Sequence, residues 1–331
     1  MQKYIQEEKE IEERTLKGSN IILYINRNSE IKAPQIQNDV NSIFSLIFSR
    51  KAILGSFPCQ QKTIYLQKEL RSANNISIEY IVNELFGIYR EIILDKNGNY
   101  FISDLIKVCE QKHRIKILEE LSPTISEDCL NCFATHPIQT LIDRASSDTE
   151  YKYILISFSD FNKFLTASLD PNGAYTIKKI IERIPNRFRS EFNYIFCSFI
   201  GFTSKTKFGI ITVKKFIACS KSDTINSLVM NLIRNNFMDL AANQYANYLI
   251  QFLLEIWSNT PELEEIKEMI FKNFQVMCEK KYSSFICELF IKIITLEEKT
   301  ELIKSLDLVY ILKSNNKHLM KIMKALCIHQ N

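Results

Sequence analysis

Hydrophobic residues recur along this chain in short segments with a helical period. In "NYLIQFLLE", residues 247–255, apolar side chains stand two, three, six and seven positions after Asn247, which places them on one face of a helix. The same frame is present in "NGNYFISDLIKVC" at 97–109 and in "YSSFICELFIKII" at 282–294. Each segment is therefore predicted to form a helix that buries one apolar stripe.

This helical frame is repeated along most of the chain, in eight copies. Successive copies start 33 to 39 residues apart when the first polar position of each is taken as its reference residue. Further helical runs, such as "IKEMIFKNFQVMCEK" at 266–280, lie between the copies, so one repeat of about 37 residues holds two or more helices. None of these helices can bury its stripe alone, which predicts an all-α solenoid. The reference residues are Thr63, Asn99, Thr135, Ala174, Ile210, Asn247, Ser284 and Lys317.

Three positions of each copy are predicted to point away from the apolar stripe: the reference residue, the residue after it and the residue four positions on. Equivalent helices of a solenoid line one surface, so these positions are expected to form a ladder of three columns. The middle column is aromatic or histidine in six of the eight copies. From the N-terminus the ladder reads Thr63/Ile64/Gln67, Asn99/Tyr100/Ser103, Thr135/His136/Gln139, Ala174/Tyr175/Lys178, Ile210/Ile211/Lys214, Asn247/Tyr248/Gln251, Ser284/Phe285/Glu288 and Lys317/His318/Lys321.

Aromatic side chains that are spaced along one surface and flanked by hydrogen-bonding groups suit single-stranded bases, which stack on the rings and present their edges to the polar residues. With this ladder the sequence resembles the Pumilio (PUF) family, whose repeats each read one base. The resemblance covers roughly residues 50–325 and is most specific in "YANYLIQFLLE" and "CEKKYSSFICELF". It implies a right-handed, crescent-shaped α–α superhelix of eight Pumilio repeats. It also implies that the chain runs antiparallel to single-stranded RNA, with the last repeat on the first base.

The resemblance further implies which base each intact pair of outer-column residues reads. In the family, Asn with Gln reads uracil, Ser with Glu reads guanine, and a small residue with Gln reads adenine. The chemistry agrees, because amides both donate to and accept from uracil, whereas a carboxylate accepts from the two adjacent donors of guanine. The expected element is 5′-UGUNNANA-3′, with G at base 2 from Ser284/Glu288, U at base 3 from Asn247/Gln251, A at base 6 from Thr135/Gln139 and A at base 8 from Thr63/Gln67.

Other copies depart from the family pattern and are expected to discriminate bases poorly. Lys178, Lys214 and Lys321 stand where the family has Gln, and they are expected either to contact phosphates and base acceptors or to be solvated surface lysines. Ser103 replaces an expected Gln, and the Ala and Ile reference residues of the fourth and fifth copies offer a base no hydrogen bond. The side chains predicted to contact RNA are Thr63, Gln67, Asn99, Tyr100, Ser103, Thr135, His136, Gln139, Tyr175, Lys178, Lys214, Asn247, Tyr248, Gln251, Ser284, Phe285, Glu288, His318 and Lys321.

Composition and charge are compatible with RNA binding without requiring it. Gly and Pro contribute seven residues each to a chain of 331, too few for the tight turns of a many-stranded β protein. The net charge is +4; residues 1–16 carry five Glu against two Lys and one Arg, a balance of −2, so the remainder carries +6. This mild excess permits a polyanionic partner. Nine cysteines without a secretory signal are expected to be reduced and mostly buried.

Motifs for catalysis and metal binding are missing from the sequence. Neither HExxH nor GxxxxGK[ST] occurs, and the four histidines stand in no nucleophile set. "CLNC" at 129–132 has metal-type spacing but no second pair, so its cysteines are expected to be core thiols in a helix. We therefore expect no enzymatic activity, no cofactor and no metal.

Two regions are expected along the chain. Residues 1–35 are predicted to be a frayed helix or a disordered tail, and residues 36–331 to be the repeat domain, with a capping half-repeat at 36–60. The resemblance to the Pumilio family implies binding of messenger RNA 3′-untranslated regions and post-transcriptional repression in the cytoplasm, with deadenylase or translation-repression factors as further partners. The alternatives are a nucleolar or nuclear ribosome-biogenesis factor of relaxed specificity and a protein-binding scaffold. A monomer is expected, with neither DNA nor a membrane as partner.

Overall fold

The computed structural model describes residues 45 and 47–328, except residues 221 and 259. These residues form α-helices and connecting turns without strands, which confirms the predicted all-α class. They make up two compact units that divide between Ile154 and Leu155. Within the described range, no helix has the length and apolarity needed to cross a bilayer. The predicted tail at 1–35 lies outside the described residues, as does most of the stretch up to residue 46.

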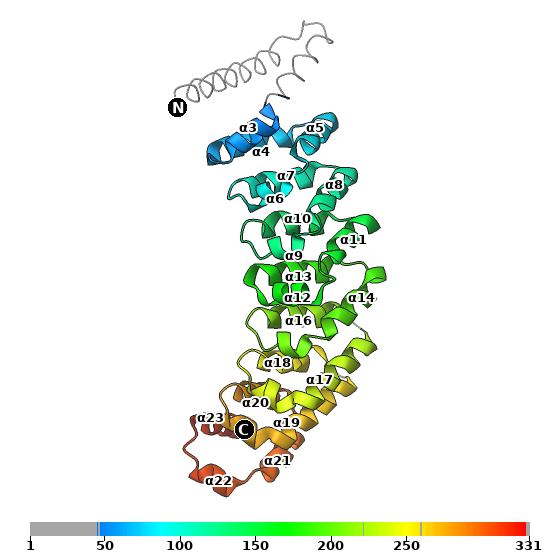
Figure 1. Cartoon of the computed structure of the whole chain (residues 1–331). Helices are drawn as coiled ribbons and strands as arrows, with labels where there is room; N and C mark the ends of the chain where they lie inside the picture. The colour runs from blue at the N-terminus through cyan, green and yellow to red at the C-terminus, as the bar shows by residue number, and fades with distance from the viewer. Residues whose placement is uncertain (1–44, 46, 221, 259, 329–331) are drawn as a thin grey trace. The chain divides into compact units, whose positions relative to one another are not determined.

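The unit that ends at Ile154 contains the first three repeats. Each repeat has a short first helix, a ladder helix that carries the predicted ladder residues, and an outer helix. The ladder helices α4, α7 and α10 pack against one another in order, and α5 contacts α8 among the outer helices (Figure 1). The helices are α3 (Arg50–Ser56), α4 (Gln60–Arg71), α5 (Asn75–Leu85), α6 (Tyr89–Leu94), α7 (Gly98–Val108), α8 (Gln111–Leu121), α9 (Ile125–Asp128), α10 (Thr135–Arg144) and α11 (Asp148–Ile156), which runs past the division.

The unit that begins at Leu155 contains the other five repeats. Its ladder helices α13, α16, α18, α20 and α23 again pack in order. Two long helices combine the outer helix of one repeat with the first helix of the next, and α17 bends at Asn236, where φ is −136° and ψ is 20°. The helices are α12 (Phe161–Leu169), α13 (Pro171–Arg183), α14 (Asn186–Cys197), α15 (Ile200–Thr203), α16 (Gly209–Cys219), α17 (Asp223–Ala242), α18 (Asn247–Ile256), α19 (Pro261–Glu279), α20 (Ser283–Ile293), α21 (Leu296–Ser305), α22 (Leu308–Lys313) and α23 (Lys317–Ile328).

The predicted apolar stripe is the core of each unit. Phe101, Ile102, Leu105 and Ile106 of α7 have no exposed area, and the equivalent residues of α18 are also buried. Full burial of a side chain of this size contributes about 1.5–3 kcal/mol relative to leaving it in water. Stacking of stripes from neighbouring repeats therefore stabilises these short helices far more than their intrinsic propensity does.

A polar turn residue fixes where most ladder helices begin. Asp95 lies four positions before the reference residue of its copy, and its Oδ1 accepts hydrogen bonds from the backbone N–H groups of the second and third residues after it, at 2.8 and 2.7 Å. Asn243 does the same before α18, at 2.9 and 3.0 Å. These bonds satisfy backbone donors that a helix start leaves unpaired. The other turn residues of this kind are Asn131, Asp170 and Asn316.

The last of these turn residues shows that the register predicted for the eighth copy is wrong by three residues. Asn316 Oδ1 accepts from the N–H groups of His318 at 2.9 Å and Leu319 at 3.2 Å, so the reference residue four positions on is Met320. Lys317 lies only one position after Asn316. In the other copies with such a turn residue, the reference residue follows it by four.

Burial and spacing agree with the corrected register. Met320 follows Ser284 by 36 residues, in line with the other copies, whereas the predicted reference residue follows it by 33. Leu319, Ile322 and Leu326, which lie one position before and two and six positions after Met320, are buried, as are the equivalent Ser283, Ile286 and Phe290 of the seventh copy. The ladder of the eighth copy is therefore Met320, Lys321 and Lys324, and His318 precedes it.

Small residues before the reference position let several ladder helices start in close contact with the preceding short helix. A Cβ atom on Gly209 would lie 2.2 Å from the Thr203 carbonyl oxygen, and one on Gly173 would lie 2.4 Å from that of Ala167. Real Cβ atoms do not approach so closely, so glycine at these positions is required by packing.

The "CLNC" motif differs from its prediction. Cys129 is buried, but Cys132 is exposed, and the motif lies in the turn after α9 instead of inside a helix. The Asn131 side chain turns the chain here toward α10, which leaves Cys132 on the outside of the turn. Among the described residues, no group of three His, Cys, Asp or Glu side chains is placed to hold a metal ion.

Candidate nucleic-acid interface

The middle column of the ladder is exposed on the ladder helices of both units. Tyr100, Tyr175 and Tyr248 have 54%, 53% and 48% of their area in solvent, and Phe285 has 39%. Single exposed apolar side chains are common on proteins, but a ring at the same position of successive repeats forms an ordered apolar surface. Flat aromatic faces of this kind are what unpaired bases stack on.

The reference residues of the first seven copies are buried, contrary to the prediction that they face outward with the other two columns, whereas Met320 of the eighth copy is 37% exposed. Asn247 has no exposed area, and Thr63 and Ser284 are 2% and 3% exposed. The Asn247 amide donates to the Asn243 carbonyl at 2.9 Å, and Ser284 Oγ donates to the Lys281 carbonyl at 2.8 Å. A reference residue sits in the first turn of its helix, so its side chain faces the carbonyls of the preceding turn, which need donors.

Two buried reference residues hold the glutamine one helical turn further on. Gln251 Nε2 donates to Asn247 Oδ1 at 2.7 Å, and Gln139 Nε2 donates to Thr135 Oγ1 at 3.1 Å. Each glutamine keeps one N–H and its carbonyl oxygen for another partner. A fixed donor next to a fixed acceptor matches the mixed donor and acceptor edge of uracil or adenine.

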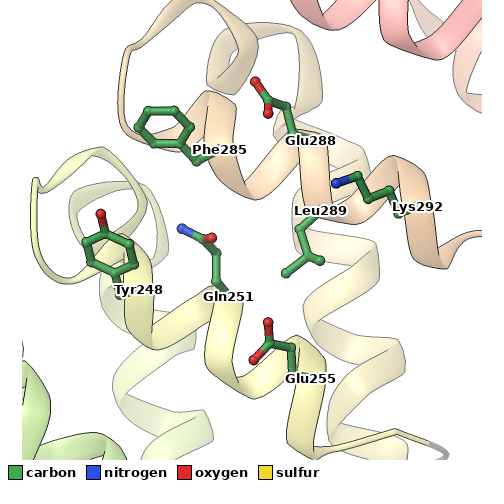
Figure 2. A pocket seen from close by; sticks show the side chains of 7 residues that line it. All are labelled: Tyr248, Gln251, Glu255, Phe285, Glu288, Leu289 and Lys292. Carbon is green, nitrogen blue, oxygen red and sulfur yellow. The ribbon is translucent and has the colours of Figure 1, made fainter.

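The middle and outer columns of the sixth and seventh copies line a common pocket of about 290 Å³ between α18 and α20. Figure 2 shows the rings of Tyr248 and Phe285 on one side of this pocket, with the Gln251 amide and the Glu288 carboxylate further along the two helices. Ring faces and edge groups therefore meet in one cavity, as recognition of a heteroaromatic base requires. The complete lining is Tyr248, Gln251, Glu255, Phe285, Glu288, Leu289 and Lys292.

A second pocket, of about 190 Å³, lies between α4 and α7 in the first unit. Four ladder residues line it, namely Thr63, Ile64, Gln67 and Tyr100, together with Gln60 and Asn97.

The ring spacing in this unit is also close to that of an inserted base. The Tyr100 and His136 rings are inclined by 22° with their centroids 6.4 Å apart. Two stacking distances of about 3.4 Å require roughly 6.8 Å. The separation of the two rings is thus slightly smaller than an inserted base would require.

The second copy supplies a ring but no group to read a base edge. Ser103 is buried, and its hydroxyl donates to the Asn99 carbonyl at 2.8 Å. The Asn99 amide nitrogen donates to the carbonyls of Asp95 and Lys96, and its Oδ1 is buried without a hydrogen-bond partner. Only Tyr100 of this copy faces outward, in keeping with the predicted poor discrimination.

Lysine side chains occupy several ladder positions in the second unit. Lys321, in the middle column of the eighth copy, forms an ion pair with Glu288 Oε1. This pair leaves the second carboxylate oxygen of Glu288 free for a base donor. In the fifth copy, Lys214 Nζ lies 5.0 Å from the centre of the Phe252 ring, while the reference residue Ile210 is buried.

The structure thus brings most predicted site residues to one face of each unit, with three differences. His318 does not belong to the ladder, the reference residues support their neighbours from beneath, and several groups were missed. The missed groups are Asp104, Glu255, Lys292, Met320 and Lys324. The short spacing of 33 before the eighth copy marks Met320 and Lys324, and the position five after the reference residue marks Asp104. Glu255 and Lys292 stand eight positions after their reference residues, where no sequence signal was read.

Comparison with known proteins gives relatives at low identity. The model of the Pumilio-family RNA binding repeat matches residues 89–122 and 236–272. The chain is 24% identical over 243 residues to the Suppressor protein MPT5 of Saccharomyces cerevisiae and 27% identical over 196 residues to Pumilio homolog 11 of Arabidopsis thaliana. These matches cover 69% and 57% of this chain but only 28% and 34% of the relatives, so they correspond to about a third of each relative.

Solved structures share the fold. The Puf4 RNA binding domain bound to the HO endonuclease RNA 3′ UTR recognition sequence aligns with a TM-score of 0.72 at 18% identity, covering 81% of this chain and 84% of that one. PUF-8 in complex with PBE-RNA aligns with a TM-score of 0.70 at 18% identity, covering 92% and 88%. At these identities the likeness concerns the arrangement of the helical repeats.

Proposed function

We propose that this chain, which belongs to the Pumilio family of RNA-binding repeat proteins, binds single-stranded RNA on its ladder helices with one base to a repeat. The exposed middle column supplies the stacking faces, and the outer column supplies the groups that read base edges. The buried reference column holds those groups in position.

The proposed sequence preference is a UGU-headed element, approximately 5′-UGUNNANA-3′. Glu288 accepts from guanine at base 2, and Gln251, held by Asn247, pairs with uracil at base 3. Gln139, held by Thr135, takes adenine at base 6. The fourth and fifth copies present no edge group besides lysine, so any base is accepted there.

The observation that carries this proposal is the pocket between α18 and α20. Its lining combines two ring faces, an amide and a carboxylate, which come from two consecutive repeats in the order that the family uses to read U and G. A protein-binding scaffold has no need of edge groups that are held by buried partners beside exposed rings. The hydrogen bond from Gln251 to Asn247 therefore favours base recognition over a general docking surface.

Replacement of the Tyr248 ring tests the proposed binding mode. Tyr248→Ala removes one stacking face from the pocket and is expected to weaken binding of the RNA UGUAAAUA by about 1–3 kcal/mol in a fluorescence titration. Tyr194→Ala is the matched control, because Tyr194 is an exposed tyrosine of α14 that lies outside the ladder. Equal losses in the two variants, or none in Tyr248→Ala, would rule out stacking on the ladder.

The cellular role that we propose is post-transcriptional repression through messenger RNA 3′-untranslated regions in the cytoplasm, with deadenylase or translation factors recruited to the bound RNA. A ribosome-biogenesis role is the second candidate, favoured by the buried Ala174 and Ile210, which leave two repeats without base-edge chemistry. Crosslinking of the protein to cellular RNA separates the two. Reads in untranslated regions support the first role, and reads in ribosomal RNA precursors support the second.

A further inference from the structure

The glutamine of the first repeat is held differently from the other two. Gln67 Nε2 donates to Asp104 Oδ2 at 2.8 Å and to the Tyr100 carbonyl at 3.4 Å. A carboxylate and a backbone carbonyl only accept hydrogen bonds, so the amide nitrogen must face them. Both hydrogens of this nitrogen are engaged, and the Gln67 carbonyl oxygen is the only group left for a base.

Asp104 is itself fixed in the interface between the first two repeats. It is 6% exposed, Arg71 donates to its Oδ2 at 2.7 Å, and Lys107 donates to its Oδ1 at 3.0 Å. Burial opposes ionisation, yet the hydrogen bonds from Arg71, Lys107 and Gln67 hold the pKa of the Asp104 carboxyl below its ordinary value. Asp104 is therefore an anion with acceptors only at neutral pH, and the two cations balance its charge.

The reference residue of the same repeat offers no donor either. Thr63 Oγ1 lies 3.2 Å from the carbonyl oxygens of both Ser56 and Cys59, so its single hydrogen is donated to the backbone. Thr63 and Gln67, the two outer-column ladder residues of the first repeat in the pocket between α4 and α7, thus present acceptors alone. Gln251 provides the contrast, because one of its amide hydrogens stays free.

The position of Asp104 in the repeat explains why only this glutamine is affected. Asp104 lies five residues after the reference residue Asn99, and the equivalent residue facing Gln251 is Leu289, five residues after Ser284. Leucine cannot accept a hydrogen bond. At this position the two sites therefore differ in whether the following repeat supplies an acceptor to the glutamine.

We propose that Asp104 is a specificity-determining positioning residue, which makes the first repeat read its base through acceptors only and prefer guanine to adenine at base 8. Guanine offers adjacent N1 and N2 donors to the Gln67 oxygen. Adenine offers its N6 donor but sets its N1 acceptor against an oxygen. The inference rests on the proposed RNA-binding function, and it departs from the adenine that the family resemblance implies.

The test is a titration of the full chain with UGUAAAUG and UGUAAAUA at one stated salt concentration. The wild-type protein is expected to bind the G8 RNA about fivefold or more tightly than the A8 RNA. Asp104→Leu, which copies Leu289, frees the Gln67 amide and is expected to shift the ranking toward A8. Asp104→Asn keeps an oxygen toward Gln67 and Arg71 and is expected to retain the wild-type ranking.

A wild-type preference for A8 overturns the proposal whether or not any variant folds. An unchanged ranking in folded Asp104→Leu overturns it too, because a merely structural role lowers affinity for both RNAs equally. The RNA UCUAAAUA is titrated alongside to separate the two levels of inference. If replacing G at base 2 weakens binding while base 8 has no effect, the Asp104 proposal fails and sequence reading by the ladder stands. If neither base matters, sequence reading by the ladder fails as well, and if no RNA binds, the proposed function itself fails.

Discussion

In the proposed binding mode, neighbouring residues of one ladder helix divide base recognition between a buried and an exposed position. Asn247 is inaccessible to solvent and fixes the amide of Gln251, whereas Tyr248, one position on, is half exposed. Preorganisation of this kind reduces the side-chain entropy that binding would otherwise cost. The identity of the buried residue therefore matters for base choice even where it makes no contact with the base.

A double substitution in the seventh repeat tests this division of roles. Ser284→Asn with Glu288→Gln reproduces the Asn247/Gln251 pair, and it is expected to change the preference at base 2 from guanine to uracil by about tenfold. The measurement is a competition titration between UGUAAAUA and UUUAAAUA. Glu288→Gln alone serves as control. It is expected to lose the preference for guanine at base 2 without gaining a clear preference for uracil, because no asparagine holds the new amide. A double variant that still prefers guanine would show that this repeat does not read base 2.

At the scale of the element, a buried ion pair with its hydrogen bonds fixes how the outer helices of neighbouring repeats pack. Glu150, at the start of α11, has no exposed area and accepts from Arg114 Nε of α8 at 2.8 Å. It also accepts from the backbone N–H groups of Ser146 and Ser147, both at 2.9 Å. Burial disfavours its charge, but these hydrogen bonds outweigh burial and lower the pKa of Glu150 from the ordinary 4.5.

Removal of the arginine partner is expected to be costly and to depend on pH. Arg114→Met leaves a buried carboxylate partly uncompensated and is expected to lower the free energy of unfolding by about 3–5 kcal/mol at neutral pH. A carboxyl group whose pKa is lowered by folding contributes stability that is present above pH 4.5 and is lost as the pH falls through the folded-state pKa. The difference in the free energy of unfolding between wild type and Arg114→Met should therefore become smaller below pH 4.5. Urea unfolding of both proteins at several pH values measures this difference in free energy.

The control lies two residues away in the same helix. Lys112 pairs with Glu79, but both side chains are more than half exposed and screened by solvent, so Lys112→Met is expected to change the free energy of unfolding far less than Arg114→Met does. If Arg114→Met is no more destabilising than this control, the buried pair of Arg114 and Glu150 does not stabilise the interface between the repeats.

Elements with a strong hydrophobic period were predictable from the sequence, and those set by side-chain hydrogen bonds were not. The stripe of α7 or α18 follows directly from apolar spacing, so the all-α repeats and the exposed middle column were correctly predicted. The register of the eighth copy depends on one turn, which the Asn316 side chain makes. The apolar pattern at 315–327 is weak, so the reference residue of this copy was predicted three positions too early. The inward turn of the reference column depends on backbone carbonyls that no residue pattern reveals.

At the scale of the whole molecule, charge adds affinity without sequence choice. The chain carries a net +4, and the fourth and fifth repeats present lysines where intact repeats present glutamine. Contacts between lysine and phosphate release counterions and make binding dependent on salt, whereas base-edge contacts do not. Affinity and specificity should therefore respond to different substitutions.

Replacement of two ladder lysines separates these contributions. Lys178→Ala with Lys214→Ala is expected to weaken all RNAs alike and to reduce the slope of log affinity against log salt by about 1.4, since each phosphate contact to a single strand contributes about 0.7. The preference for guanine at base 2 should stay unchanged. Lys272→Ala, an exposed lysine of α19 outside the ladder, is the control. An unaltered slope would mean that the two ladder lysines are solvated and contact no phosphate.

The chain is proposed to read RNA sequence through the edge groups of its ladder helices. The most direct measurement is a titration of the wild-type protein with UGUAAAUA and UCUAAAUA at one stated salt concentration. We predict a loss of tenfold or more, about 1.4 kcal/mol, on changing the single guanine that Glu288 is proposed to read. Equal binding of the two RNAs would contradict sequence reading by this ladder, and binding of neither would contradict the RNA-binding function as a whole.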